Sequence, residues 1–238
     1  MSNNIIFFKN IKFYNLSPKK VLDKMIDEGG YLVAPAASSL QTISKNKLYH
    51  KALQDSTIAI LDSGFFCILL RIFNKIKVNK LSGFLLMREF LNKTSFKKKK
   101  ILLINPNINE EKINQLFFKK KKFLHINSYI APQYNAPHLF HDHKLIKVVK
   151  NLKPDIILVN ISGEKQEILA RFINKKLQNK KISIFCLGAA IGFFTGTQAR
   201  VTVFADKFYL GWLVRWGREP IKYWPRVFNS FKLTRLFF

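Results

Sequence analysis

The sequence predicts an α/β fold with a Rossmann-like wound sheet that is mainly parallel and carries helices on both faces. Two observations lead to this prediction. Short runs of β-branched and apolar residues alternate along the chain with longer helical patterns, which is typical of a parallel sheet with right-handed crossovers. Most of these runs are almost continuously apolar, such as IILVNI and ISIFCL, as expected for strands covered on both faces.

The predicted elements follow one another in a regular order. Strands are expected at Tyr31–Ala34, Thr57–Leu61, Ile101–Ile104, Asp155–Ile161 and Ile182–Leu187. Helices are expected at Pro18–Glu28, Ser38–Gln54, Ser63–Asn74, Phe84–Leu91, Glu110–Phe118, Asp142–Leu152 and Glu164–Asn179. We expect an α/β domain over residues 1–202 and a basic, aromatic helical appendage over residues 203–238.

The composition is that of a globular protein with a strongly basic surface. The 238 residues allow one sizeable core, and 48% of them are apolar. The 41 Lys and Arg against 14 Asp and Glu give a net charge of +27. Such a surface favours polyanions, which are nucleic acid, anionic lipid headgroups or phosphorylated substrates. A general bias of the composition toward Lys, Asn, Ile and Phe is the alternative explanation of the Lys surplus.

The chain shows the features of a cytosolic protein. Cys67 and Cys186 lie far apart in apolar runs, which favours buried thiols in a reducing compartment. The first residues, MSNNIIFFKNIKFYN, lack the apolar stretch and cleavage site of a secretory signal. The longest apolar candidate, Thr57 to Phe73, is broken by Asp62 and Arg71 and is too short to span a membrane. Any contact with a membrane is therefore expected at its surface.

The appendage mixes aromatic and cationic residues. It contains all three tryptophans, Trp212, Trp216 and Trp224, and only Asp206 and Glu219 as acids. This composition is typical of an interfacial amphipathic segment, with rings at the headgroup level and cations on phosphates. Two alternatives remain, a helix that docks its aromatic stripe on the core and a set of rings that stack on single-stranded nucleic acid.

One chemically distinctive turn contains Asp62, which directly follows an apolar strand, while Ser63 and Gly64 open the next helix. Ligands of open α/β sheets bind at the carboxyl ends of the strands. A carboxylate there is partly desolvated, so we expect its pKa to rise into the range of a general base. The alternative is that Asp62 caps the helix, a role that Asp often fills.

Two further turns suit a ligand. Ser162 and Gly163 join a strand to a helix whose first N–H groups favour phosphate, and Lys165 adds a positive charge. Gln166 offers an amide for a uracil edge, a sugar hydroxyl or a phosphate. The segment from Gly188 to Arg200 is rich in small residues, which suits a close approach of the backbone to a ligand.

A histidine-rich segment, PHLFHDH, suggests a metal site. Its spacing matches no common metal site, and Asp142 is better explained as the N-cap of the next helix. The sequence has no Asp-x-Asp pair. We therefore expect neither a metal nor another cofactor.

The order of these segments resembles the bacterial WecG/TagA/CpsF glycosyltransferases (glycosyltransferase family 26), over roughly residues 30 to 230. No single segment is specific, whereas their order and spacing together are. The matching segments are Asp62-Ser63-Gly64, Lys80-Leu81-Ser82-Gly83, Pro154-Asp155 through Lys165-Gln166-Glu167, and Trp212 to Arg226.

The resemblance implies an inverting transfer of an N-acetylhexosamine-type sugar from a UDP-sugar donor to a polyprenyl-diphosphate-linked acceptor, in surface polysaccharide synthesis. It implies a peripheral place on the inner face of the plasma membrane, and it assigns the catalytic base to Asp62. The residues expected to bind the substrate are Gln166, Lys165, Gly64, Lys80, Gly188 and Arg200. Those expected to contact the lipid diphosphate or the anionic membrane are Arg215, Arg218, Arg226, Trp212 and Trp216.

Several positions depart from the family pattern. Ala34 and Ala36 stand where the family has Thr and Asn, which removes two polar contacts with the substrate. Lys80 replaces an Arg and cannot make its bidentate phosphate contact. These changes keep a non-catalytic descendant that binds sugar nucleotides as a second interpretation. A basic nucleic-acid-binding protein is the third, although we expect no nucleic acid partner. The sequence leaves open whether the active form is a monomer or a homo-oligomer.

Overall fold

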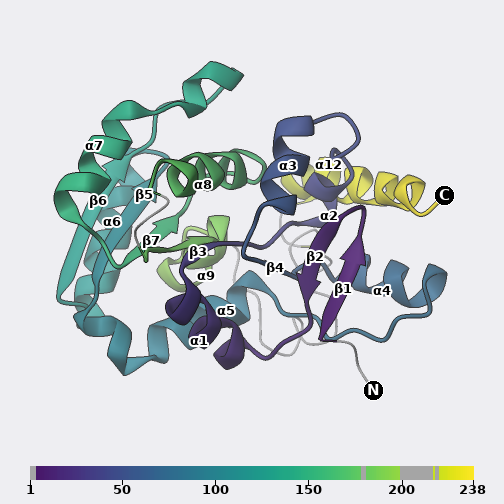
Figure 1. The fold of residues 1–238 in the computed structure, drawn as a ribbon, viewed down its shortest axis with the longest axis horizontal. Coiled ribbons are helices and arrows are strands. Elements are labelled where there is room, and N and C mark those ends of the chain that lie inside the picture. The colour runs from purple at the N-terminus through teal and green to yellow at the C-terminus, as the bar shows by residue number, and fades with distance from the viewer. Residues whose placement is uncertain (1–3, 178–180, 199–216, 218–219) are drawn as a thin grey trace.

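The computed structural model describes residues 4–177, 181–198, 217 and 220–238. Over these residues the strands form one eight-stranded sheet in the order β1-β2-β4-β3-β8-β7-β5-β6 (Figure 1). The pairings are parallel except for the antiparallel hairpin of β1 and β2 at one edge. The strands are β1 (Ile5–Phe8), β2 (Ile11–Tyr14), β3 (Gly30–Val33), β4 (Ile58–Ile60), β5 (Lys100–Asn105), β6 (His125–Ile130), β7 (Ile156–Val159) and β8 (Ser183–Cys186).

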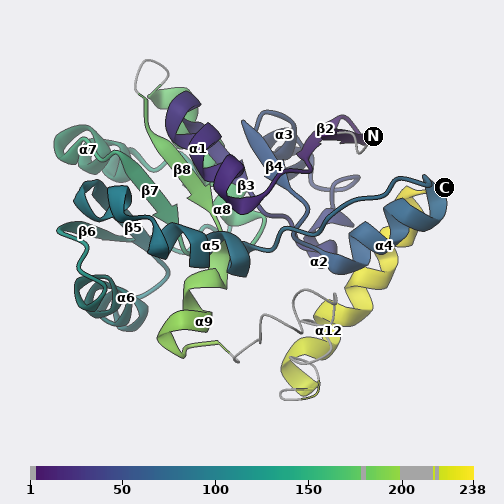
Figure 2. The ribbon, with the colours of Figure 1, turned by 90° about the horizontal axis from the view of Figure 1, so that it is seen from below.

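Helices cover both faces of this sheet, so the predicted Rossmann-like fold is confirmed (Figures 1 and 2). The α-helices are α1 (Pro18–Glu28), α2 (Ala37–Leu40), α3 (Lys47–Gln54), α4 (Gly64–Phe73), α5 (Gly83–Asn92), α6 (Ile108–Lys120), α7 (His143–Leu152), α8 (Lys165–Lys176), α9 (Gly192–Thr195) and α12 (Pro220–Phe231). Short 3₁₀ helices occur at η1 (Thr94–Lys98), η2 (Pro137–Phe140), η3 (Gly188–Ile191) and η4 (Lys232–Leu236).

The central strands separate two hydrophobic cores. Every residue of β7 is buried; Ile156 and Leu158 face one core, and Ile157 and Val159 face the other. Helices α1, α5 and α6 contribute to the first core, and α3, α4, α7 and α8 contribute to the second. This two-sided burial explains why the strand sequences are continuously apolar.

Most predicted elements lie where the sequence placed them. Each of the five predicted strands is present within one or two residues of its expected ends. The predicted helix Ser38–Gln54 is wrong in one respect, because it is two helices, α2 and α3. The side chain of Asn46 accepts a hydrogen bond from the N–H of Tyr49, so Asn46 is the N-cap at which α3 begins as a separate helix. Cys67 and Cys186 are free and buried, as predicted.

Three strands were not predicted. Strands β1 and β2 are joined by Lys9 and Asn10, which both have positive φ angles, 47° and 62°, as a two-residue hairpin turn requires. Strand β6 is an edge strand with half-exposed, partly polar side chains and no continuous apolar run. The pattern that reveals strands buried on both faces is therefore missing at both edges of the sheet.

The described end of the chain both docks on the core and exposes aromatic rings. Leu233 is fully buried, and the ring of Phe237 lies 4.8 Å from that of Phe8. Along α12, however, the side chains of Trp224 and Phe228 remain 55% and 57% exposed. The predicted domain boundary at residues 202 and 203 lies outside the described residues. Within the described part of the chain, every helix is too short or too polar to cross a membrane.

Candidate active site

A cavity of about 600 Å³ lies at the carboxyl ends of four neighbouring strands. Ala34 follows β3, Asp62 follows β4, Asn160 follows β7 and Gly188 follows β8, and all four residues line it. These strands are parallel, so their carboxyl ends meet at one edge of the sheet. The cavity therefore brings together the three turns that the sequence singles out.

Asp62 reaches across the cavity edge to a second helix. Its Oδ1 atom accepts a hydrogen bond of 2.7 Å from the backbone N–H of Gly83, the first residue of α5. The cap of α4 is Ser63, whose hydroxyl accepts from the N–H of Phe66. The alternative in which Asp62 caps its own helix is therefore wrong. The half-buried carboxylate instead meets the positive end of the α5 dipole, which stabilises its negative charge.

Gln166 lies beside the turn that follows β8. Gly188 has a positive φ of 53°, and a Cβ atom at this position would lie 3.5 Å from both amide head atoms of Gln166. A side chain at position 188 would be strained by this backbone conformation and would fill the space against the amide. Gly188 therefore allows the turn to pass close to the buried head group of Gln166.

Three buried side chains of this cavity carry oxygen atoms without a hydrogen-bond partner. They are Oδ1 of Asn160, Oε1 of Gln166 and Oε2 of Glu167. The other ends of these side chains are fixed, because Gln166 donates to Oε1 of Glu167 at 2.9 Å and Asn160 donates to Asn105 at 3.2 Å. Among the residues that the structure describes, these three acceptors have no donor, which is energetically unfavourable for buried oxygen atoms.

Burial has the largest effect on the pKa of Glu167. It raises the pKa of the Glu167 carboxyl from 4.5 to about 7, although the hydrogen bond from Gln166 favours the ionised form. The group thus takes up a proton near neutral pH.

Cationic side chains reach the cavity from two sides. Lys80 lies in the connection before α5, and Arg226 lies on α12, and both line the cavity. Lys165, which we expected at the same site, is not among the lining residues that the structure describes. Its Nζ atom instead donates to Asn135 at 3.1 Å, on the exposed surface.

The comparison with known protein families agrees with this geometry. The model of the Glycosyl transferase WecG/TagA/CpsF family matches residues 6–238. The chain belongs to this family. A search of curated proteins found no match. Family membership supports a glycosyltransferase that acts in polysaccharide synthesis and uses a sugar donor and an acceptor.

The cavity of this glycosyltransferase gathers most of the predicted site residues that the structure describes. Asp62, Gly64, Lys80, Gln166 and Gly188 line it together. Arg226, expected at the lipid diphosphate or the membrane, lines it too. Apart from Lys165, the remaining predicted residues lie outside the described part of the chain and are Arg200, Trp212, Arg215, Trp216 and Arg218.

Sequence reasoning named Glu167 only as part of a motif and gave it no role. A signal was present, because Glu167 precedes the buried Ala170 and Ile173 at spacings of three residues, which places it on the inner face of α8. Glu110 is a second cavity residue that the sequence did not single out. Burial raises the pKa of Glu110 as well.

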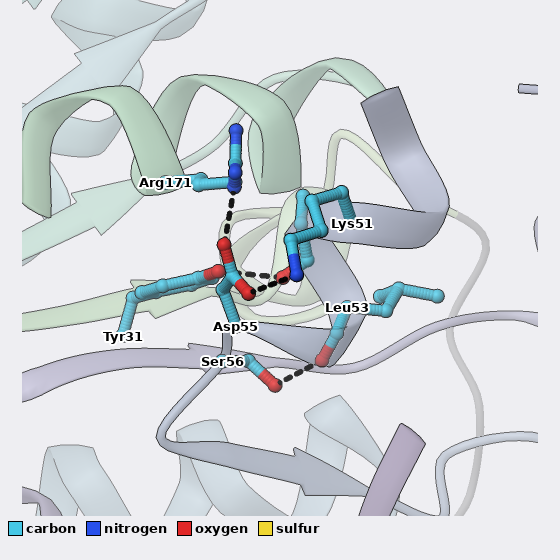
Figure 3. A network of polar contacts seen from close by, with 7 residues as sticks. Tyr31, Lys51, Leu53, Asp55, Ser56 and Arg171 are labelled. Atoms are coloured by element: carbon cyan, nitrogen blue, oxygen red, sulfur yellow. Dashed lines mark hydrogen bonds and ion pairs between the residues drawn. The ribbon is translucent and has the colours of Figure 1, made fainter. Parts of the chain in front are cut away.

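Hydrogen bonds and an ion pair connect α8, which carries Gln166 and Glu167, to α3 (Figure 3). Asp55 follows α3 and accepts from Nε of Arg171 on α8 at 2.8 Å, and Lys51 pairs with it at 3.2 Å. Burial would raise the pKa of Asp55, but the hydrogen bonds from Arg171 and Lys51 outweigh it and lower the pKa. On β3, Tyr31 donates to the carbonyl of Ala52 in α3 at 2.6 Å.

The Glu167→Gln variant is expected to remove a loss of stability at high pH. A carboxyl whose pKa is raised by folding destabilises the folded state as pH rises from 4.5 toward 7. The variant should therefore match the wild type near pH 4.5 and exceed its free energy of unfolding by about 3 kcal/mol at pH 8. Urea unfolding at both pH values measures this difference. Glu111→Gln, on α6 outside the cavity lining, is the control, and an equal gain at both pH values would contradict the assignment.

Proposed function

We propose that the protein is an inverting glycosyltransferase that moves an N-acetylhexosamine-type sugar from a UDP-sugar to a polyprenyl-diphosphate-linked acceptor, with Asp62 as the base. One observation carries this proposal. A single cavity is lined by a carboxylate, a buried amide, a glycine turn and an arginine, which are Asp62, Gln166, Gly188 and Arg226. A carboxylate beside a pocket that suits sugar and phosphate groups is what such a displacement requires.

The reaction is a single displacement at the anomeric carbon. An acceptor hydroxyl oxygen bonds to this carbon while the bond to the UDP oxygen breaks, and the leaving UDP keeps the electron pair. The hydroxyl proton passes to the carboxylate of Asp62. Attack from the side opposite the leaving group inverts the anomeric centre. A positioned base of this kind contributes about 10² to 10⁴ in rate.

The leaving diphosphate needs positive charge. Lys80 and Arg226 supply it from two sides of the cavity. The first residues of α4 and α5, Gly64 and Gly83, also line the cavity, so the positive ends of two helix dipoles lie at its edge. Charges and dipoles that are already in place need no reorganisation when the diphosphate leaves.

Helix α12 suits an acceptor that is held by a lipid. Its residues Arg226 and Ser230 line the cavity, while Trp224 and Phe228 are exposed. Aromatic side chains favour the interface of a bilayer, and cations favour its phosphates. We therefore propose that the protein associates peripherally with the anionic inner face of the membrane, with the cavity open toward it.

One observation favours a second candidate, a non-catalytic descendant that binds sugar nucleotides. Ala34 and Ala36 line the cavity with methyl groups where the family pattern has polar side chains. A pocket that has lost these two contacts can retain a nucleotide without orienting the sugar for transfer.

A transfer assay separates the two candidates. The purified full-length protein is incubated with a panel of UDP-N-acetylhexosamines and a polyprenyl-diphosphate-linked sugar acceptor in phospholipid vesicles. We expect UDP release that depends on the acceptor and a product with the inverted anomeric configuration, read by NMR. Binding of UDP-sugars without transfer to any acceptor would favour the non-catalytic descendant. A product with retained configuration would contradict the single displacement.

A further inference from the structure

Helix α4 is apolar on its exposed side as well as on its buried side. Its inner residues Phe66, Cys67, Leu69 and Leu70 are buried in the core. On the outside, Ile68 is 42% exposed and Ile72, one turn later, is 62% exposed. A helix that is apolar all round is normally covered by something on every side. We therefore expect a binding partner to cover the outer side of α4.

The charged residues within α4 and in the segment that follows it, as far as Arg88, are all cationic. Arg71, Lys75 and Lys77 are exposed at its carboxyl end. No Asp or Glu occurs in the sequence between Asp62 and Glu89. A partner that covers Ile68 and Ile72 must therefore be apolar where it meets the isoleucines and anionic around them.

The end of the chain continues this surface. Helices α4 and α12 lie side by side (Figure 2). The ring of Phe65 on α4 lies 5.4 Å from Phe231 on α12, and that of Phe73 lies 5.0 Å from Phe238. Phe238 itself is 90% exposed. No acidic residue follows Glu219. We call the exposed residues Ile68, Ile72, Phe73, Phe231 and Phe238, together with the adjoining cations, the α4 face.

We propose that the α4 face is a membrane-binding surface that inserts its apolar side chains among anionic lipid headgroups. This inference rests on the proposed function for the lipid-linked acceptor, but vesicle binding can be measured without any transfer. A second copy of the chain fits this face poorly, because an isologous contact would bring Arg71, Lys75 and Lys77 of two copies together without an acid between them. An anionic bilayer meets both the apolar and the cationic side chains.

The α4 face also places the cavity relative to the bilayer. The first residues of α4, Gly64 and Phe65, line the cavity, and so do Arg226 and Ser230 of α12. Two helices that border the cavity would thus both contact the headgroups. Two contacts restrict the orientation of the protein on the bilayer more than a single helix does.

Vesicle flotation of the full-length protein tests the α4 face. The vesicles contain equal parts of phosphatidylglycerol and phosphatidylcholine, with phosphatidylcholine alone for comparison. The Ile68→Asn/Ile72→Asn variant is expected to lower the partition coefficient about tenfold, because it removes apolar surface from the bilayer. Lys75→Glu/Lys77→Glu is expected to weaken binding to the anionic vesicles only.

The matched control is Leu116→Asn, which replaces a residue 68% exposed on α6, away from α4. Thermal unfolding confirms that all variants fold.

Several results of the flotation assay would contradict the proposal that the α4 face binds membranes. Partition of the α4 variants equal to that of the wild type, or an equal loss in Leu116→Asn, would overturn the proposal, as would a wild type that does not float. A variant that loses self-association in sedimentation but keeps its vesicle binding would show that the face contacts a second copy. Failure of the proposed function looks different, because the wild type would then float but transfer no sugar.

Discussion

The Asp62→Asn variant is expected to lower the rate of sugar transfer by about 10² to 10⁴ and to leave the fold intact. The amide keeps the shape of the carboxyl group and keeps an oxygen that can accept from the N–H of Gly83, at 2.7 Å in the wild type. It cannot take the proton of the acceptor hydroxyl. The loss should therefore fall on the rate constant of transfer, while the affinity for the UDP-sugar changes little. Single-turnover kinetics and calorimetric titration measure the two quantities separately.

The matched control for Asp62 is Asp27→Asn. Asp27 is exposed on α1 and does not line the cavity, so the same chemical change there should leave transfer unaffected. An Asp62→Asn variant that turns over at nearly the wild-type rate would show that another group accepts the proton. A variant that fails to bind the donor would assign Asp62 a binding role instead.

The sequence predicted the centre of this fold better than its edges. Strands β7 and β8 are buried on both faces, so their residues are apolar regardless of which helix packs above them. At the edges the constraint is weaker. Strand β6 exposes part of each side chain, and its sequence, HINSYI, has no unbroken apolar run. The β1–β2 turn uses Lys9 and Asn10, and this pair lacks the glycine that usually marks such a turn.

For the site, the sequence predicted which turns meet but not how each side chain is held. That Asp62, Gln166 and Gly188 share an edge follows from parallel strands alone. That Ser63 rather than Asp62 caps α4 does not follow, because both residue types cap helices and they are adjacent. The hydrogen bond from Gly83 to Asp62 depends on where α5 docks, and this position is set by tertiary packing.

The same reasoning explains Lys165 and Glu167. A lysine in the first turn of a helix favours an anion in general, but its long side chain can turn outward, and here it reaches Asn135. Glu167 is the opposite case, because Glu is a residue type that is usually exposed to solvent. The inner face of α8 carries it into the cavity wall, where burial brings its pKa to about 7.

The Asp142→Ala variant is expected to lower the free energy of unfolding by about 3 to 5 kcal/mol, with little effect on transfer. Asp142 caps α7, as predicted, through a hydrogen bond of 2.9 Å from the N–H of Leu145. Its Oδ2 atom also accepts from the hydroxyls of Tyr129 and Tyr134, at 2.7 and 2.8 Å. Burial raises the pKa of both tyrosines, and their bonds to the carboxylate raise it further, so they remain donors. Removing the carboxylate leaves three donors without a partner.

Graded variants divide this loss between its parts. Asp142→Asn keeps the cap of α7 but loses the charge shared by the two hydroxyls, so its unfolding free energy should lie between those of Asp142→Ala and the wild type. Tyr129→Phe removes one half-buried donor and should lower the unfolding free energy by about 1 kcal/mol. Urea unfolding measures the free energies of unfolding of the three variants and of the wild type. A chelator is expected to leave the Tm of the wild type unchanged; a fall in Tm would revive the metal interpretation of the neighbouring histidines. Unfolding of Asp142→Ala at the wild-type urea midpoint would show that solvent satisfies these donors, and that the carboxylate serves something other than stability.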